Sequence, residues 1–130
     1  MQAKALLAVL ASVLQLATLA SAYAHGDDKP KRGGIMGRGD DSVSIELVME
    51  QGAVVLYVEE HMNDVPIPTQ GVKGWLSLAA SGRPAQEAKL IPAGENKLTA
   101  TGLKPARGDR LRARIVLPNG DEISSIFSVR

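Results

Sequence analysis

Two histidines, His25 and His61, are the side chains best suited to bind a metal ion in this chain of 130 residues. If the chain is cleaved directly before His25, the free α-amine and the imidazole nitrogen of that residue could chelate one cation together, as suits Cu(II). Asp27 and Asp28 could add carboxylate ligands. The pattern predicts a site for Cu(II) or another divalent transition metal on His25, Asp27, Asp28 and His61, provided that the N-terminal arm folds back. In the alternative interpretation, His25 only follows a cleavage site and His61 is a solvated loop residue.

Arginines at every second position, Arg110, Arg112 and Arg114, place three cations on one face of a predicted strand. This arginine ladder could be a surface for anions or for an acidic partner. In the alternative interpretation it is a solvated outer face, where the arginines pair across strands with acids such as Glu122.

Thioether sulfurs at Met36, Met49 and Met62 would suit Cu(I). These methionines are not spaced as an M-x-M or M-x-x-M cluster, so a methionine copper site is not expected. The alternation around Met49 predicts instead that its side chain packs in the core.

The composition excludes several classes of protein. The absence of cysteine excludes a disulfide framework, a thiolate metal site and a cysteine nucleophile. A formal net charge of +1 argues against a protein whose function is to bind nucleic acid. We do not expect an enzyme, because His61 is the one well-placed candidate base and no serine has a nucleophile-elbow context. The glycines of residues 33–39 also lack the Lys-Ser/Thr that completes a phosphate-binding loop.

Residues 1–24 have the features of a secretory signal peptide. Lys4 supplies a positive charge, residues 5–19 form an apolar run, and Ala22 and Ala24 give the A-x-A pattern. The run is shorter than the roughly 20 residues that a membrane-spanning helix needs. We therefore expect cleavage after Ala24 and a periplasmic or secreted chain that is not embedded in the membrane. The alternative is a retained N-terminal anchor.

Residues 25–41 are rich in glycine and in charges that cancel, with Ile35 and Met36 as their sizeable apolar groups. Such a stretch buries too little apolar surface to offset its ordering entropy. The composition predicts a flexible polar arm.

From residue 42 to residue 130, apolar residues alternate with polar ones and turn residues recur about every ten positions. Pro118-Asn119-Gly120-Asp121 is the strongest hairpin signal. The expected strands are 43–50, 54–59, 75–80, 88–90, 98–100, 111–117 and 123–129. About seven short strands favour an immunoglobulin-like antiparallel β-sandwich over a barrel. We predict an all-β fold with one domain, residues 42–130.

Two segments carry a resemblance to a known group of proteins. They are residues 54–74, VVLYVEEHMNDVPIPTQGVKG, followed by WLSL, and residues 91–98, IPAGENKL. The chain resembles small periplasmic immunoglobulin-like β-sandwich proteins associated with heavy-metal efflux systems of the resistance-nodulation-division type, over about residues 42–130. The resemblance implies an accessory role in metal homeostasis or efflux, with a periplasmic efflux component as partner. Among the residues that carry it, only His61 has ligand chemistry.

A weaker similarity rests on His25 as the mature N-terminus. In this respect the chain is similar to C-type periplasmic copper-resistance proteins, β-sandwiches that use that residue for Cu(II). It departs from them because the arm of residues 25–41 precedes the first strand and because a late Asp-x-His pair is absent. The sequence therefore predicts an exported, non-enzymatic accessory module that binds a divalent metal such as copper. The alternative is a protein-interaction sandwich whose sheet edges and arginine ladder dock an efflux or envelope partner without metal.

Overall fold

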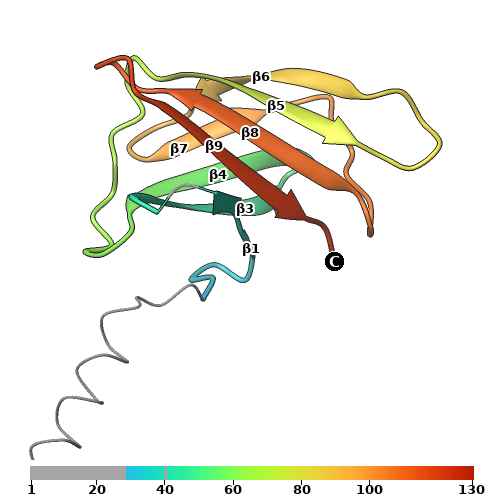
Figure 1. The fold of residues 1–130 in the computed structure, drawn as a ribbon, viewed down its shortest axis with the longest axis horizontal. Coiled ribbons are helices and arrows are strands. Elements are labelled where there is room, and N and C mark those ends of the chain that lie inside the picture. The colour runs from blue at the N-terminus through green and yellow to red at the C-terminus, as the bar shows by residue number, and fades with distance from the viewer. Residues whose placement is uncertain (1–28, 40) are drawn as a thin grey trace, which may run out of the picture.

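The computed structural model describes residues 29–39 and 41–130, and this part of the chain consists of strands, turns and loops (Figure 1). It contains no helix long and apolar enough to cross a membrane. The strands are β1 (Ile35–Met36), β2 (Arg38–Gly39), β3 (Val43–Glu50), β4 (Ala53–Glu60), β5 (Lys73–Ala79), β6 (Gln86–Pro92), β7 (Lys97–Ala100), β8 (Arg110–Val116) and β9 (Glu122–Ser128).

The seven longer strands, β3–β9, occupy the seven segments that the alternation predicts. Residues suited to tight turns explain two of the hairpins. Gln51 and Gly52 both have positive φ, 50° and 78°, between β3 and β4. Between β8 and β9, Gly120 has φ 93° and the Asp121 N–H donates to Asn119 Oδ1 at 2.9 Å. The prediction of an all-β antiparallel fold is confirmed.

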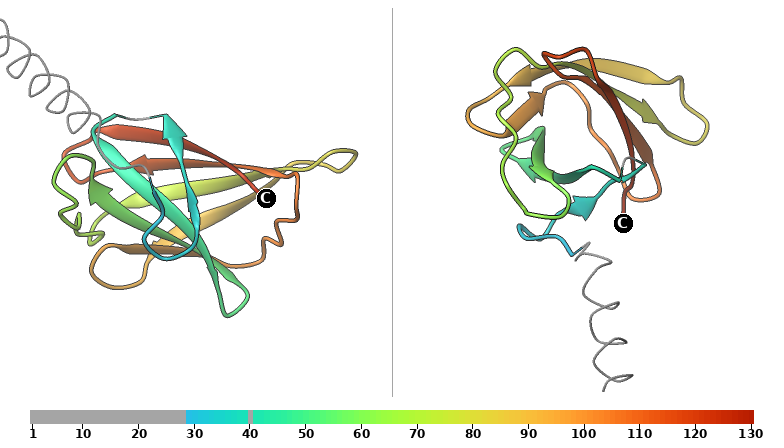
Figure 2. Two further views of the ribbon diagram at one scale, coloured as in Figure 1. Left: turned by 90° about the horizontal axis from the view of Figure 1, so that it is seen from below. Right: turned by 60° about the vertical axis from the view of Figure 1, so that its left-hand side comes forward.

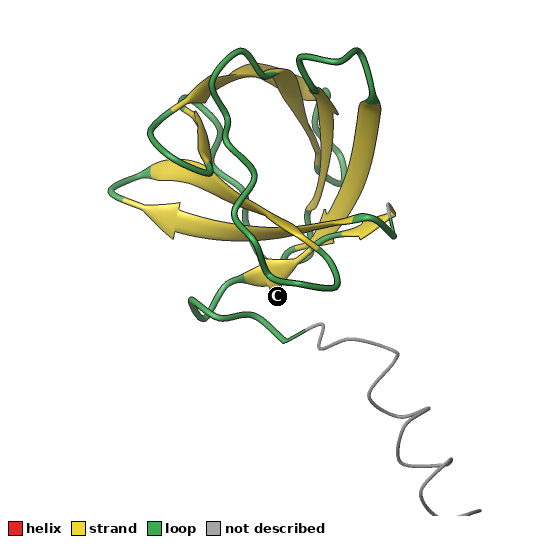
Figure 3. Ribbon diagram, turned by 90° about the vertical axis from the view of Figure 1, so that its left-hand side faces the viewer, coloured by secondary structure: helices red, strands yellow, loops and turns green. Residues whose placement is uncertain are grey.

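The strands form one antiparallel sheet of nine in the order β1-β3-β4-β7-β6-β5-β8-β9-β2. Strand β6 joins the two halves of the sheet, because its first part pairs with β5 and Ile91–Pro92 pair with β7. Strands β1 and β2 are separated only by Gly37, so both ends of the strand order lie in one segment. The sheet is therefore nearly barrel-shaped (Figures 2 and 3), and an immunoglobulin-like sandwich of seven strands is not confirmed.

The core lies inside this curved sheet and is filled by the inward side chains of β3–β9. Its largest fully buried side chains include Phe127, Leu56, Leu76, Leu98 and Leu111. The prediction that Met49 packs in this core is wrong, because its side chain is 48% exposed. Met49 lies near the end of β3 beside the turn, where its side chain remains exposed to solvent.

Residues 35–39, which we call the closing segment, differ from the flexible arm expected over residues 25–41. Ile35 pairs with Leu47 of β3, and Arg38 pairs with Ile126 of β9. The Gly37 N–H donates to the Ile45 carbonyl at 2.9 Å. The segment thus joins the two edges of the sheet.

Glycine permits this close approach. A Cβ atom on Gly37 would meet the Ser125 hydroxyl and would lie 2.8 Å from Cζ of Phe127. A Cβ atom on Gly34 would meet the Leu47 carbonyl and would lie 2.9 Å from Cγ2 of Val48. The composition that predicts flexibility here allows a backbone to pack directly on a sheet.

Candidate functional site

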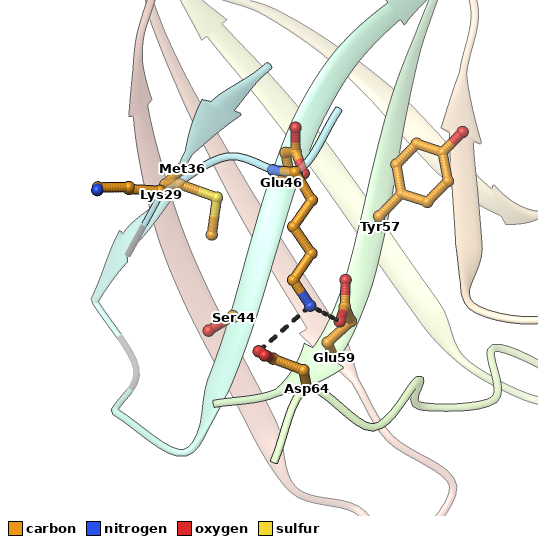
Figure 4. A pocket seen from close by; sticks show the side chains of 8 residues that line it. Lys29, Met36, Ser44, Glu46, Tyr57, Glu59 and Asp64 are labelled. Carbon is orange, nitrogen blue, oxygen red and sulfur yellow. Dashed lines mark hydrogen bonds and ion pairs between the residues drawn. The ribbon is translucent and has the colours of Figure 1, made fainter. Parts of the chain in front are cut away.

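Two carboxylates on the outer face of the β3–β4 hairpin, Glu46 and Glu59, are buried beneath the residues that precede β1 (Figure 4). They are 3% and 8% exposed. They lie near each other because Glu46 pairs in register with Tyr57, two residues before Glu59. Buried carboxylates need hydrogen bonds or ionic partners to offset their desolvation.

Glu46 is satisfied mainly by backbone. Its side chain accepts the N–H groups of Lys31 at 3.0 Å, Arg32 at 2.8 Å and Gly34 at 3.0 Å. Gly33, with φ 68°, provides the bend that aims these N–H groups at one carboxylate. Glu46 therefore fixes the path of the chain into the closing segment.

Glu59 is satisfied by side chains. Its carboxylate oxygens lie 2.9 Å from Nζ of Lys31 and 3.1 Å from Nη1 of Arg32. Lys31 also lies 3.3 Å from Asp64, and the dashed lines in Figure 4 mark the two lysine contacts. We call Lys31, Arg32, Glu46 and Glu59 the N-terminal clamp.

The contacts of the clamp shift two pKa values in opposite directions. Burial opposes ionisation of Glu59, but the hydrogen bonds from Lys31 and Arg32 outweigh it and hold the pKa of this carboxyl below its ordinary value. The hydrogen bond to Glu59 raises the pKa of the Lys31 ammonium. Arg32 also stacks over the Tyr57 ring, 4.0 Å from its centroid. These interactions give the clamp a structural role, because both of its carboxylates already form hydrogen bonds or ion pairs within the protein.

Of the four predicted metal ligands, the structure describes one. His61 follows the end of β4 and is half-buried, with Nδ1 2.9 Å from Oγ of Ser44. His25, Asp27 and Asp28 lie outside the described residues. Within residues 29–39 and 41–130, no three His, Asp or Glu side chains form a group that could hold a metal ion. Every buried side-chain nitrogen or oxygen in this part of the chain has a hydrogen-bond partner.

A groove of about 910 Å³ runs beside the closing segment, between the edges of β3 and β9. Residues that line it include Pro30, Arg38, Val43, His61, Arg110 and Ile126. The groove thus brings His61 and the chain preceding the closing segment to the same place as three arginines, Arg38, Arg110 and Arg130, and one acid, Asp41. Sequence reasoning missed it, because it forms where strands distant in the chain come together.

The arginine ladder divides into paired and unpaired members. Nε of Arg114 lies 2.8 Å from the Glu122 carboxylate, as the solvated-face interpretation predicts, and its guanidinium lies 5.4 Å from the Trp75 ring centroid. Arg110 and Arg112 have no carboxylate within 4 Å in the described part of the chain. Two members therefore keep their charge available to a partner.

Comparison of the chain with protein-family models, curated proteins and solved structures gives no match.

Proposed function

We propose that this protein is an exported, non-enzymatic accessory module of metal homeostasis or efflux, built on an immunoglobulin-like β-sandwich. Its signal sequence is residues 1–24, and it acts in the periplasm by docking a component of an efflux system or of the envelope. The observation that carries this proposal is the set of unpaired arginines beside an open groove. Arginines without an ion pair inside the protein can form charge-assisted hydrogen bonds with the carboxylates of a partner.

Affinity capture from periplasmic extract tests the docking function. The wild-type mature chain should retain a periplasmic component of a metal-efflux assembly, identified by mass spectrometry. The Arg110→Glu/Arg112→Glu variant should lose it. The Lys104→Glu/Arg107→Glu variant makes the same charge change in the loop before β8 and should retain it. Equal capture by all three proteins would exclude the arginine ladder as the docking surface.

Metal binding is the second candidate function, supported by the path of the chain. Pro30 and His61 line one groove, and Lys29 and Ser44, the hydrogen-bond partner of His61, line a second, smaller pocket. The four residue-to-residue steps from His25 to Lys29 can span at most about 14 Å. A site on His25, Asp27, Asp28 and His61 therefore requires this short stretch to turn toward β4. Three arginines, Arg38, Arg110 and Arg130, line the same groove and outnumber Asp41, so the groove opposes a cation and we rank docking first.

Calorimetry with Cu(II), Zn(II) and Ni(II) on the chain that begins at His25 tests this candidate. We expect Cu(II) to bind with a Kd below about 10 μM, equivalent to ~7 kcal/mol, and His25→Ala and His61→Ala each to weaken it. One extra residue before His25 keeps the imidazole but displaces the free amine. Unchanged Cu(II) affinity in that variant would exclude N-terminal chelation, and no saturable binding in the parent chain would exclude the metal site.

A further inference from the structure

A row of side chains crosses the outer face of β2, β9 and β8. Arg38 of β2 pairs in register with Ile126 of β9, which pairs with Arg112 of β8. Residues paired in this way point to the same face, so the isoleucine lies between two arginines. Neighbouring strands lie about 4.8 Å apart, which places the backbones of the two arginines roughly 10 Å apart. Figure 1 shows β8 and β9 side by side in orange and red.

Arg110 adds a third cation to this row. It precedes Arg112 by two residues on β8, so both arginines lie on one face, and it pairs with Ser128 of β9. We call Arg38, Arg110, Arg112 and Ile126 the basic patch. Three of its four members, Arg38, Arg110 and Ile126, also line the groove beside the closing segment.

Like several other exposed cations in the described part of the chain, among them Lys89, Lys104 and Arg107, the arginines of the basic patch form no ion pair within the protein. Arg32, Arg83 and Arg114 each form an ion pair with a carboxylate at 2.8–3.4 Å. In the described part of the chain, no carboxylate lies within 4 Å of any arginine of the patch. The residues in register with Arg112 are Ser77 and Ile126, both uncharged.

The patch also has an exposed apolar centre. The Ile126 side chain is 43% exposed, although the buried residues Ser125 and Phe127 flank it. An exposed isoleucine between unpaired arginines suits a ligand that combines carboxylates with an apolar side chain. Inorganic phosphate or a nucleotide phosphate would use the arginines and leave the isoleucine without a partner.

We infer that the basic patch is the docking site for an acidic, extended peptide segment of a protein partner, in which an apolar side chain lies between carboxylates. This inference rests on the proposed docking function and specifies the chemistry of the partner. Carboxylates of the segment pair with Arg38, Arg110 and Arg112, and the apolar side chain covers Ile126. The groove of about 910 Å³, lined by Asp41 as well as by arginines, leaves room for a segment of a few residues beside the patch.

Fluorescence anisotropy with a labelled (Glu-Leu)4 peptide tests the inference, and a (Lys-Leu)4 peptide serves as the charge control. The wild-type chain should bind the acidic peptide saturably and the basic peptide at least tenfold more weakly. The Arg38→Gln/Arg110→Gln/Arg112→Gln variant should lose at least tenfold in affinity. Lys89→Gln/Lys104→Gln/Arg107→Gln removes the same charge outside the patch and should change the affinity less than twofold. Equal losses in both variants would overturn the inference.

The apolar centre has its own matched pair of variants. Ile126→Ser should weaken the affinity for the acidic peptide severalfold, whereas Ile91→Ser, at a comparably exposed position of β6, should leave that affinity unchanged.

Binding to phosphatidylglycerol vesicles is measured as well, with phosphatidylcholine vesicles as the neutral control. Tighter binding to phosphatidylglycerol vesicles than to the peptide would replace the proposed partner by an anionic membrane and overturn the inference.

This experiment separates the inference from the function on which it rests. If the peptide does not bind but the arginine-to-glutamine variant still captures an efflux component, docking stands and the proposed site is wrong. If the peptide binds and no efflux component is captured, the site stands and the proposed function fails. Folding of each variant is checked by its thermal unfolding, which should match the wild type because these side chains are exposed.

Discussion

Gly37 lets the closing segment pack closely between β3 and β9, a role that the glycine-rich composition of this stretch does not indicate. Its N–H pairs with β3, while its Cα faces the Ser125 and Phe127 side chains of β9. Any side chain at this position must displace the Phe127 ring, a fully buried part of the core. The closing segment can therefore pack against β9 only because residue 37 has no side chain.

Gly37→Ala should destabilise the protein by about 1–3 kcal/mol, because the added methyl group overpacks this contact. Each kcal/mol corresponds to a melting temperature lower by roughly 4–8 °C in a domain of this size. Gly33→Ala is the control, since a Cβ atom there meets open space and only its positive φ is strained. Equal melting temperatures for Gly37→Ala and the wild type would show that the segment is not packed on β9.

Glu46 is a carboxylate on a strand that is used as a backbone anchor. In Glu46→Gln, one oxygen becomes an amide NH₂ group that faces backbone N–H donors, so at least one buried donor loses its acceptor. We expect a loss of about 1–3 kcal/mol in the free energy of unfolding, measured by urea denaturation. Glu60→Gln, at an exposed position on the same strand as Glu59, should shift the midpoint little. Equal shifts in both variants would contradict the anchoring role.

At the scale of elements, the N-terminal clamp makes the docking of residues 29–34 dependent on pH. The pKa of Glu59 is lower in the folded protein, so its contribution is complete above the ordinary value of about 4.3 and is lost as pH falls through the folded value. The pKa of Lys31 is raised, so its contribution is complete below about 10.4 and is lost as pH rises through the folded value.

Docking of these residues should therefore be strongest between about pH 5 and pH 10. The amide protons of Lys31, Arg32 and Gly34 report it directly, because they are hydrogen-bonded to Glu46. Their protection from hydrogen exchange, corrected for the intrinsic exchange rate, should fall below pH 4 before global unfolding begins. In Glu59→Gln the protection lost on acidification should be smaller, and an unchanged acid response in that variant would exclude Glu59 as its source.

The strands were predictable because their signals are local. Alternation places Ile45 and Leu47 in the core, and Asn119-Gly120 marks a tight turn, without reference to any distant residue. The clamp was not predictable, because Lys31 and Arg32 acquire their roles only when the fold places Glu46 and Glu59 beneath them. Glycines at 34 and 37 are compatible with flexibility and with close packing, and only the neighbouring strands decide between the two.

The candidate site shows the same division. The arginine ladder was visible in the spacing of Arg110 and Arg112, but Arg38 joins it only through the pairing of β2 with β9. Met49 was misplaced because alternation gives the side of a strand and not whether that side is covered.

At the scale of the whole molecule, closure of the sheet protects two edges that would otherwise be open. A chain that begins at Asp41 lacks the closing segment and leaves the edges of β3 and β9 unpaired. Such edges promote pairing between chains. We expect this truncated chain to self-associate or to unfold at a lower temperature than the mature protein, measured by analytical ultracentrifugation and calorimetry. A monomer with an unchanged melting temperature would show that closure contributes nothing.

The pairing of Arg38 with Ile126 also sets the order in which the protein can fold. The closing segment is made before β3, and β9 is the last of the nine described strands, so β2 must wait for its partner. Contacts between such distant residues form late and slowly, because the intervening loop must be closed first. Until then β2 lacks its partner and the sheet is not closed, and in this interval the chain is most exposed to aggregation and to capture by chaperones.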